Sequence, residues 1–240
     1  MARLPRLNLP DIPQHIIQRG NNRHVCFFEE NDYVVYLSKL KEYAEKYQVE
    51  IHSYVLMTNH VHLLATPRNK TGVSEMMQSL GRYFVRYINK RHGRTGTLWE
   101  GRFKSCLVDS DNYFLTVSKY IELNPVRARM VAHPAEYPWS SYRFNALGKN
   151  ITLITPHDCY FALGRDDVSR RNTYNQLFLI DIPDSTLEEI RNAINKAWAL
   201  GEDRFIKQIE AQTGRRASAL PRGGDRKSKA FQRAHAINLL

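Results

Sequence analysis

The spacing of apolar residues changes several times along the first half of the chain, and each change predicts a different element. Four short runs are rich in residues that favour β-strands, and they span 14–19, 51–57, 60–66 and 103–109. Three segments have helical spacing, and these helices are expected to begin near Asn31, Ser74 and Asp111. The element order is therefore β-α-β-β-α-β-α. It predicts an α+β fold, the ferredoxin-like split βαβ sandwich, in which a four-stranded antiparallel sheet carries helices on one face.

The second half of the chain differs in composition from the first, which predicts two parts, residues 1–150 and 151–240. The second part is expected to be a mostly helical extension. Ser185 and Glu188 predict a capping box for a helix that runs to about Leu200. A further helix is expected after it, followed by a strongly basic tail.

The net charge of the chain indicates which class of partner it binds. Its 240 residues include 35 Lys and Arg against 24 Asp and Glu, a net charge of +11, and 42% of them are hydrophobic. This composition predicts a folded core, and the positive charge favours a polyanion, either nucleic acid or an anionic membrane. No stretch reaches the roughly 18 apolar residues of a spanning helix, so we expect no membrane partner.

Two further function classes are not expected. The chain has neither a Walker A loop nor a G-x-G-x-x-G motif, so a nucleotide cofactor is not predicted. Its three cysteines, Cys26, Cys106 and Cys159, are too few and too far apart for a disulfide framework or a zinc site. This cysteine usage fits a reducing cytoplasm.

Two histidines in the third β-rich run form the sharpest local feature, the sequence Asn59-His60-Val61-His62. Because side chains alternate along a strand, His60 and His62 are expected on one face and Val61 on the other. Two neutral imidazoles side by side are a good clamp for a divalent metal, although a third ligand must come from elsewhere in the fold. The alternative is a pair of histidines that face solvent or are satisfied in the core.

A tyrosine near the end of the third predicted helix is the second feature, in the sequence YIELNP over residues 120–125. Tyr120 and Asn124 are four residues apart and share a face of the helix. A tyrosine at such a position is usually a core residue with a hydrogen-bonded hydroxyl. The functional alternative is a nucleophile, which needs activation because a free phenol has a pKa of about 10. A metal that polarises the target phosphate would help.

Basic residues form a stripe along the second predicted helix. Arg82, Arg86 and Lys90 are spaced four residues apart, and Arg102 and Lys104 continue the positive charge beyond the helix. Aromatic residues lie between them in the sequence. Basic groups follow a phosphate backbone and aromatic rings stack on unpaired bases, so this segment favours nucleic acid as a partner. The alternative is a solvated charged face with its aromatic residues turned into the core.

Taken together, these motifs resemble a known family. NHVH at 59–62 and YIELNPVRA at 120–128 are similar to the single-tyrosine HUH transposases, and more closely to the REP-associated tyrosine transposases. QRGNNR at 18–23 and WEGRFKS at 99–105 match as well, so the resemblance covers about residues 10–145. It implies a metal-dependent enzyme that cleaves and rejoins single-stranded DNA beside a hairpin, with Mg²⁺ or Mn²⁺ as its cofactor.

The resemblance also implies a role for each matching residue. His60 and His62 correspond to the metal ligands, Tyr120 to the nucleophile, and Asn124 to a further ligand of the same metal. Tyr120 would form a 5′-phosphotyrosine and release a free 3′-OH, which can later rejoin the strands without ATP. The REP-associated branch resembles a monomer that works in cis, whereas insertion-sequence relatives are swapped dimers. Contacts with DNA are expected from Arg19, Arg23, Arg82, Arg86, Lys90, Arg102, Lys104, Arg127, Arg215 and Arg216.

Three hypotheses therefore follow from the sequence: an enzyme that acts through Tyr120, a repeat-DNA-binding protein without catalysis, and a metal-dependent nuclease in which water attacks. The intact set of His60, His62, Tyr120 and Asn124 favours the enzyme. The sequence leaves open whether Tyr120 reaches the metal within one chain or from a partner subunit. The basic tail, within residues 185–235, is expected to add affinity for the hairpin.

Overall fold

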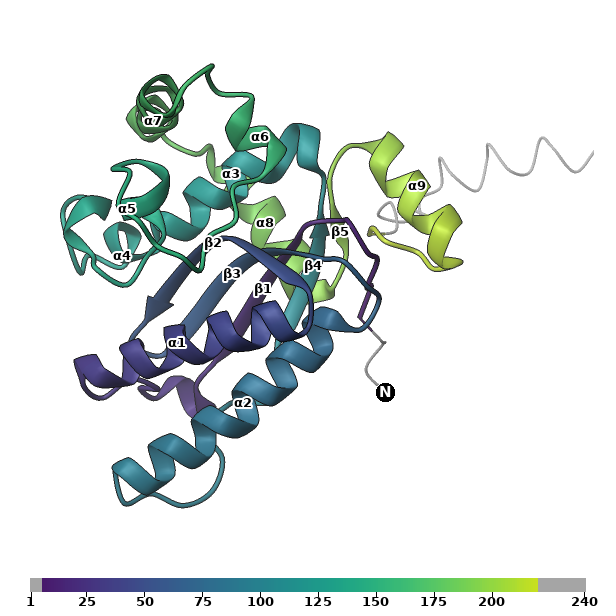
Figure 1. The fold of residues 1–240 in the computed structure, drawn as a ribbon. Coiled ribbons are helices and arrows are strands. Elements are labelled where there is room, and N and C mark those ends of the chain that lie inside the picture. Colours follow the sequence, from purple (N-terminus) through teal and green to yellow (C-terminus); the bar gives the residue numbers. More distant parts are fainter. Residues whose placement is uncertain (1–5, 220–240) are drawn as a thin grey trace, which may run out of the picture.

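The computed structural model describes residues 6–219, and its elements up to α3 follow the predicted order (Figure 1). They are β1 (Gln14–Arg19), α1 (Glu30–Lys46), β2 (Val49–Met57), β3 (His60–Pro67), α2 (Gly72–Arg91), β4 (Lys104–Val108) and α3 (Ser110–Glu122). Thr58 and Asn59 form the turn of the expected hairpin between β2 and β3. A 3₁₀ turn, Asn21–Arg23, lies in the connection from β1 to α1.

The sheet has the strand order β2-β3-β1-β4-β5, one strand more than predicted. Its first four strands are antiparallel, as expected. The fifth, β5 (Ala199–Leu200), pairs in parallel with β4. The sequence predicts a helix up to Leu200 instead. That helix, α8 (Asp184–Lys196), ends earlier at Ala197, which adopts the left-handed conformation with φ 55° and turns the chain toward the sheet.

Helices cover both faces of the sheet, whereas the sequence predicted them on one face (Figure 1). On the first face α1 and α2 lie side by side, and Leu80 packs with the strand residue Leu63 in one apolar cluster. On the second face Val117 of α3 and Ile190 of α8 join a cluster that contains Leu64. Leu63 and Leu64 are neighbours in β3 and point in opposite directions. The prediction was incomplete because α3 and α8 follow β4 and return to the uncovered side.

Three helices begin at other positions than the sequence suggested. Asp109 caps α3 in place of Asp111, and its carboxylate accepts the backbone N–H of Asp111. The side chain of Asn69 accepts the first backbone N–H of α2 at 2.6 Å, so Ser74 lies inside the helix. The expected capping box at Ser185 is absent, since Pro183 is the N-cap of α8 and the helix begins two residues earlier, without a side-chain cap. These corrections leave the element order unchanged.

After α3 the chain forms a series of helices of up to 13 residues, which confirms a mostly helical extension. They are α4 (Asn124–Arg127), η2 (Pro134–Glu136), α5 (Tyr142–Asn145), α6 (Asp158–Phe161), α7 (Asp167–Gln176), η3 (Leu177–Leu179), α8 and α9 (Asp203–Thr213). The division at residue 150 stays a prediction. Within residues 6–219, no helix combines the length and the apolar character that crossing a membrane requires. Most of the basic tail, residues 220–240, lies outside the described residues.

Candidate active site

Three histidines lie together on the face of the sheet that α3 covers. His60 and His62 share this face, as their alternation in β3 predicted, while Val61 packs in the opposite core. In the neighbouring strand β1 the register places Arg19 beside His60. His15, also in β1, stacks its ring on that of His62 with the ring centroids 5.1 Å apart. The centroids of His60 and His62 are also 5.1 Å apart, so two adjacent strands collect three imidazoles.

All three imidazoles are neutral at neutral pH. Burial lowers the pKa of His15 to about 3 and the pKa of His60 to about 4. Burial, reinforced by neighbouring charges, lowers the pKa of His62 well below its ordinary value. A neutral imidazole keeps a lone pair for a metal ion, whereas a protonated one cannot ligate it. The electrostatics of this face therefore suit metal binding.

The hydrogen bonds of His60 and His62 leave the same nitrogen of each ring available. Nδ1 of His62 lies 2.8 Å from Nε2 of His15, and Nδ1 of His60 lies 2.6 Å from Oδ1 of Asn59. Such outer contacts orient a ligand ring, and they leave both Nε2 atoms for a cation. The pair therefore fits the Mg²⁺ or Mn²⁺ that the resemblance implies, with oxygen atoms completing the ligand set that these metals prefer.

Tyr120 projects from α3 onto this group of histidines. Its ring centroid lies 6.0 Å from that of His62 and 5.8 Å from that of His15, in edge-on contacts. Tyr120 is 6% exposed and belongs to the apolar cluster beneath α3. The tyrosine and the histidines come from one chain. A single copy of the protein therefore brings together the two motifs that the sequence analysis singled out.

The guanidinium of Arg127, in α4, stacks on the ring of Tyr120 with its Cζ 3.9 Å from the ring centroid. Its Nη2 donates a hydrogen bond to Oδ1 of Asn124 at 3.1 Å. Its Nη1 is buried and has no hydrogen-bond partner within residues 6–219. Burial lowers the pKa of Arg127, but an arginine stays protonated at neutral pH. A fixed positive charge with an unused donor therefore lies against the phenol.

Asn124 is engaged by groups other than the histidines. Its Nδ2 donates to the backbone carbonyl oxygens of Tyr120 and Ile121, each at 3.1 Å, so the side chain caps the end of α3. Its Oδ1, the atom that would ligate a metal, accepts the hydrogen bond from Arg127. Ligation of a metal by Asn124 stays a prediction, and it requires this contact to open.

Glu122 lies two residues after Tyr120 and is fully buried. Its carboxylate accepts hydrogen bonds from Ser141, Asn145 and Tyr174 at 2.5, 2.8 and 2.9 Å. Burial raises the pKa of Glu122 to about 7. These partners belong to the segment around α5 and to α7, so Glu122 anchors the end of α3 to the part of the chain that follows it.

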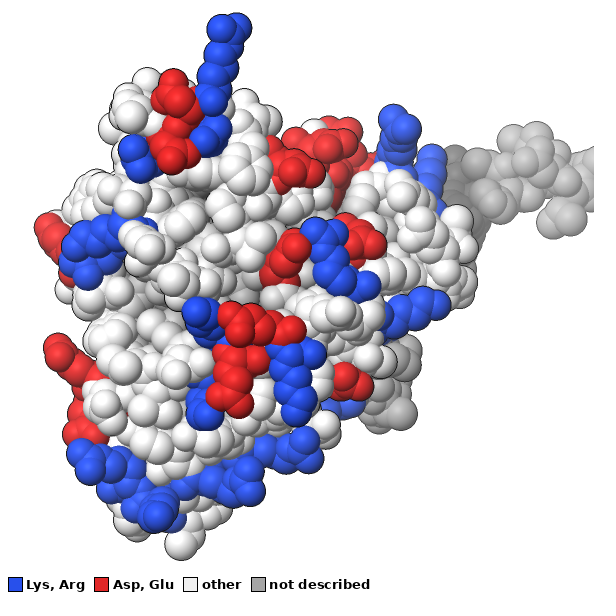
Figure 2. All heavy atoms as spheres, in the orientation of Figure 1, with Lys and Arg blue, Asp and Glu red and all other residues white. Residues whose placement is uncertain are grey.

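A groove of 1210 Å³ runs along α2, on the face of the sheet opposite the histidines. Three of the predicted DNA contacts, Arg82, Arg86 and Arg102, line it together with aromatic residues that include Trp99. Figure 2 shows the band of Lys and Arg that follows α2. Lys90 lies on the same helix but does not line the groove. Basic side chains in a groove follow a phosphate backbone, and aromatic rings beside them can stack on exposed bases, so the groove suits nucleic acid.

The other predicted DNA contacts are spread over the molecule. Arg19 and Lys104 lie on the histidine face, in β1 and β4. Arg23 is exposed in the 3₁₀ turn after β1. Arg215 and Arg216 follow α9 and do not line the α2 groove. The structure therefore brings part of the predicted set to the histidines and part to the α2 groove, and the individual roles stay predictions.

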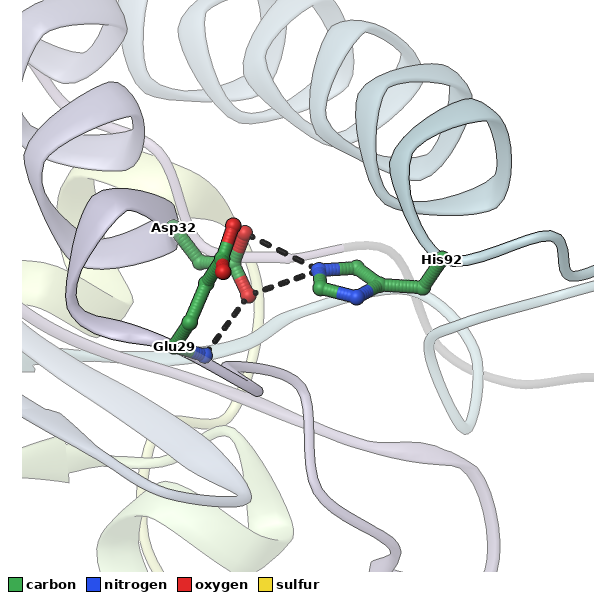
Figure 3. Close-up of side chains that lie close together, drawn as sticks. All are labelled: Glu29, Asp32 and His92. Carbon is green, nitrogen blue, oxygen red and sulfur yellow. Dashed lines mark hydrogen bonds and ion pairs between the residues drawn. The ribbon is translucent and has the colours of Figure 1, made fainter.

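A second group of side chains that can bind metals lies where the start of α1 meets the end of α2 (Figure 3). Glu29, Asp32 and His92 place their potential ligand atoms close together. The atoms of Asp32 already have partners, since they accept the backbone N–H groups of Phe28 and Glu29 and contact Nε2 of His92 at 3.1 Å. Glu29 is paired with Arg91. This group caps α1 and joins it to α2, and we assign no metal to it.

Sequence reasoning missed two sets of residues near the site. Alternation along β1 places His15 and Arg19 on the same side of the strand, so this signal could have identified His15. Arg191 of α8 lies near Arg127, and Asn195 of the same helix accepts a hydrogen bond from Lys104. These two had no such signal, because no local pattern tells which face of a sheet a distant helix will cover.

Residues 9–124 match the family described as IS200-like transposases. A protein of Haemophilus influenzae (strain Rd) named "Putative REP-associated tyrosine transposase" is 26% identical over an alignment of 122 residues, and the match covers 46% of this chain and 69% of that protein. The solved structure of a REP-associated tyrosine transposase bound to a REP hairpin has a similar fold, with a TM-score of 0.50 at 17% identity over 65% of this chain and 93% of that one. Residues 9–124 therefore match the IS200-like transposase family, and the resemblance to the REP-associated tyrosine transposases is confirmed; the solved structure shows a shared fold.

Proposed function

We propose that this chain cleaves single-stranded DNA beside a hairpin through Tyr120 and rejoins it, with Mg²⁺ or Mn²⁺ held by His60 and His62. The observation that carries the proposal is the approach of the Tyr120 ring to 6.0 Å from the ring of His62 within one chain. The neutral imidazoles with free Nε2 atoms support metal ligation. The positive charge of Arg127 at the same place supports a reaction in which negative charge develops.

The proposed step transfers a phosphodiester to tyrosine. The Tyr120 oxygen attacks phosphorus and forms the bond of a 5′-phosphotyrosine, while the bond from phosphorus to the 3′-oxygen breaks. The phenol gives its proton to water beside Arg127, and the departing oxygen takes up a proton from water to become a free 3′-OH. A metal ion bound by the histidines would neutralise charge on the phosphate oxygens. Because the phosphotyrosine keeps the bond energy, a 3′-OH can reverse the step and rejoin strands without ATP.

We assign the α2 groove to the hairpin. Arg82, Arg86 and Arg102 supply charges for the phosphate backbone, and the net charge of +11 supports a polyanionic partner. The groove and Tyr120 lie on opposite faces of the sheet, which separates recognition of the hairpin from cleavage of its flank. The related solved structure is of a protein bound to a REP hairpin, and this supports the same class of partner here.

The proposal is tested with labelled hairpin DNA that carries single-stranded flanks, incubated with Mg²⁺ or Mn²⁺ and resolved on a denaturing gel. The parent protein should yield a covalent adduct and a cleaved strand. Tyr120→Phe should yield neither and should bind the hairpin with unchanged affinity. Tyr113→Phe is the matched control, because Tyr113 lies on the same helix with its hydroxyl bonded to Glu189, and it should react like the parent.

Two outcomes of this assay contradict the proposal. Cleavage that persists in Tyr120→Phe would identify water as the attacking group and the protein as an ordinary metal-dependent nuclease. A parent protein that binds the hairpin but never cleaves it would be a repeat-binding protein.

The arrangement within one chain further supports action in cis by a monomer. A mixture of Tyr120→Phe with His62→Ala should stay inactive, because neither chain carries both groups. Adduct formation restored by mixing would show that subunits exchange the tyrosine.

A further inference from the structure

The helix α8, from the second half of the chain, is built into the histidine face of the sheet. Its buried residues Ile190, Ala193 and Ile194 belong to the same apolar cluster as Tyr120. The helix packs on β4 and β1, and Figure 1 shows it beyond the strands, on the side of α3. It lies outside the residues that match the transposase family, which end at 124. The second half of the chain therefore reaches the candidate active site.

Two polar side chains of α8 border this site. Arg191 and Asn195 are four residues apart, on one side of the helix. Oδ1 of Asn195 accepts a hydrogen bond from Nζ of Lys104 at 2.9 Å. Burial lowers the pKa of Arg127, and the nearby charge of Arg191 lowers it further. The helix therefore runs from the neighbourhood of Arg127 to that of Lys104.

Asn195 also forms part of the wall of a pocket of 260 Å³ on the histidine face. The pocket is lined by Ile17, Arg19, Glu100, Arg102, Lys104 and Asn195. In the pairing of β1 with β3, Arg19 lies beside His60 and Ile17 beside His62, so the pocket adjoins the candidate metal ligands. Three basic side chains face one acid in this pocket. Within residues 6–219, the guanidinium groups of Arg19 and Arg102 make no hydrogen bond or ion pair.

We propose that this pocket binds a phosphodiester of the single strand that connects the hairpin with Tyr120, and that α8 forms one wall of the pocket. This inference rests on the proposed function. Unpaired guanidinium and ammonium groups are the usual partners of DNA phosphates. The pocket is slightly smaller than the about 300–1,000 Å³ of sites that enclose a drug-sized ligand, so its size suits a short piece of one strand.

The position of Arg102 indicates the path of the single DNA strand between the groove and the pocket. Arg102 lines both this pocket and the α2 groove assigned to the hairpin. A strand that leaves the groove therefore meets the pocket before it reaches His60. In this arrangement α8 positions the flank for cleavage, which is a role distinct from the affinity expected of the basic tail.

Asn195→Asp tests the proposal with little change in shape. The new carboxylate would draw Lys104 into an ion pair and place a negative charge in the pocket. Asn192→Asp is the matched control, since it makes the same change at an exposed position of the same helix that does not line the pocket. Binding is measured in EDTA, so that no cleavage occurs, for a hairpin with and without its single-stranded flank over a series of salt concentrations.

Only the affinity for the flanked hairpin is expected to change. Asn195→Asp should weaken binding of the flanked hairpin about tenfold at low salt. It should also reduce the slope of log K against log salt concentration by about 0.7, the value for one single-strand phosphate contact. Binding of the hairpin without its flank should not change, and Asn192→Asp should match the parent with both DNAs.

Other outcomes would overturn the proposal. They are an equal decrease in affinity for both DNAs, an unchanged affinity for the flanked hairpin, or a flank that adds no affinity in the parent. Weaker binding of inorganic phosphate by Asn195→Asp, with binding of flanked DNA intact, would identify a site for free anions instead. Because the measurement needs neither metal nor chemistry, it can fail while the adduct assay succeeds, and the reverse also holds.

Discussion

His15 is expected to decide whether His62 can bind a metal. For His62 to ligate through Nε2, its Nδ1 must carry the proton and donate it, and Nε2 of His15 is the acceptor 2.8 Å away. Burial lowers the pKa of His15 to about 3, so its ring is neutral and keeps a lone pair for this hydrogen bond. In His15→Leu the proton of His62 either stays on Nδ1 without an acceptor or moves to Nε2, which blocks ligation.

The size of the effect follows from the burial of this pair. A buried donor without a partner costs about 1–3 kcal/mol, and each 1.4 kcal/mol is about a factor of ten in binding. We therefore expect the Mn²⁺ affinity of His15→Leu to fall about 5- to 150-fold. This range contains the roughly 10- to 100-fold typical of outer partners of metal-bound histidines.

The assay is a Mn²⁺ titration followed by the electron paramagnetic resonance signal of the free ion. Thermal unfolding is recorded alongside, so that a misfolded variant is recognised. His15→Gln keeps a hydrogen-bond acceptor and should retain more of the affinity than His15→Leu. A folded His15→Leu protein that binds Mn²⁺ as tightly as the parent would refute the reasoning.

Three further predictions concern the surroundings of the site and the α2 groove. Arg127→Gln removes the positive charge that faces Tyr120 and should slow adduct formation about 10²- to 10³-fold, with the affinity for the hairpin unchanged. An unchanged rate of adduct formation would exclude a catalytic role for this charge. The pKa of Glu122 is about 7 in the folded protein, compared with its ordinary value of 4.5, so the folded state holds this proton more tightly than the unfolded state. The parent protein should therefore lose stability as the pH rises from about 5 to 7, by up to about 3 kcal/mol. Urea unfolding of Glu122→Gln at pH 5 and pH 8 should show a smaller decrease in stability than the parent, and equal decreases would contradict the raised pKa. In the groove, the double variant Arg82→Gln with Arg86→Gln should reduce the slope of log K against log salt concentration for hairpin binding. The expected reduction is about 0.9 for each duplex phosphate that these arginines neutralise. An unchanged slope would show that the groove does not bind the hairpin.

Most of what the sequence could predict about the site follows from the alternation of side-chain directions along the strands. The direction of a side chain in a strand depends on its own position, so the shared face of His60 and His62 was accessible from the sequence alone. The same rule applied to β1 would have put His15 and Arg19 on one side of that strand. It could not show that His15 meets His62, because that contact depends on the pairing of β1 with β3.

Features that depend on distant contacts were missed or predicted wrongly. β5 has two residues and exists through its pairing with β4, so no local pattern predicts it. Asp109 and Asp111 are equally good capping residues, and the path of the chain from β4 into α3 selects Asp109. The hydrogen bonds of Asn124 to the carbonyl oxygens of α3 and to Arg127 also had no local signal, and ligation of a metal by Asn124 stays a prediction.

The site of covalent attachment is the most direct measurement of Tyr120 as the nucleophile. The protein is incubated with flanked hairpin DNA and Mn²⁺, the DNA is trimmed with a nuclease, and the tryptic peptide that carries a nucleotide is identified by mass spectrometry. Tyr120 is expected to carry the phosphate at the 5′ end of the cleaved strand. Attachment at any other residue, or cleavage without a modified peptide, would contradict a Tyr120 nucleophile.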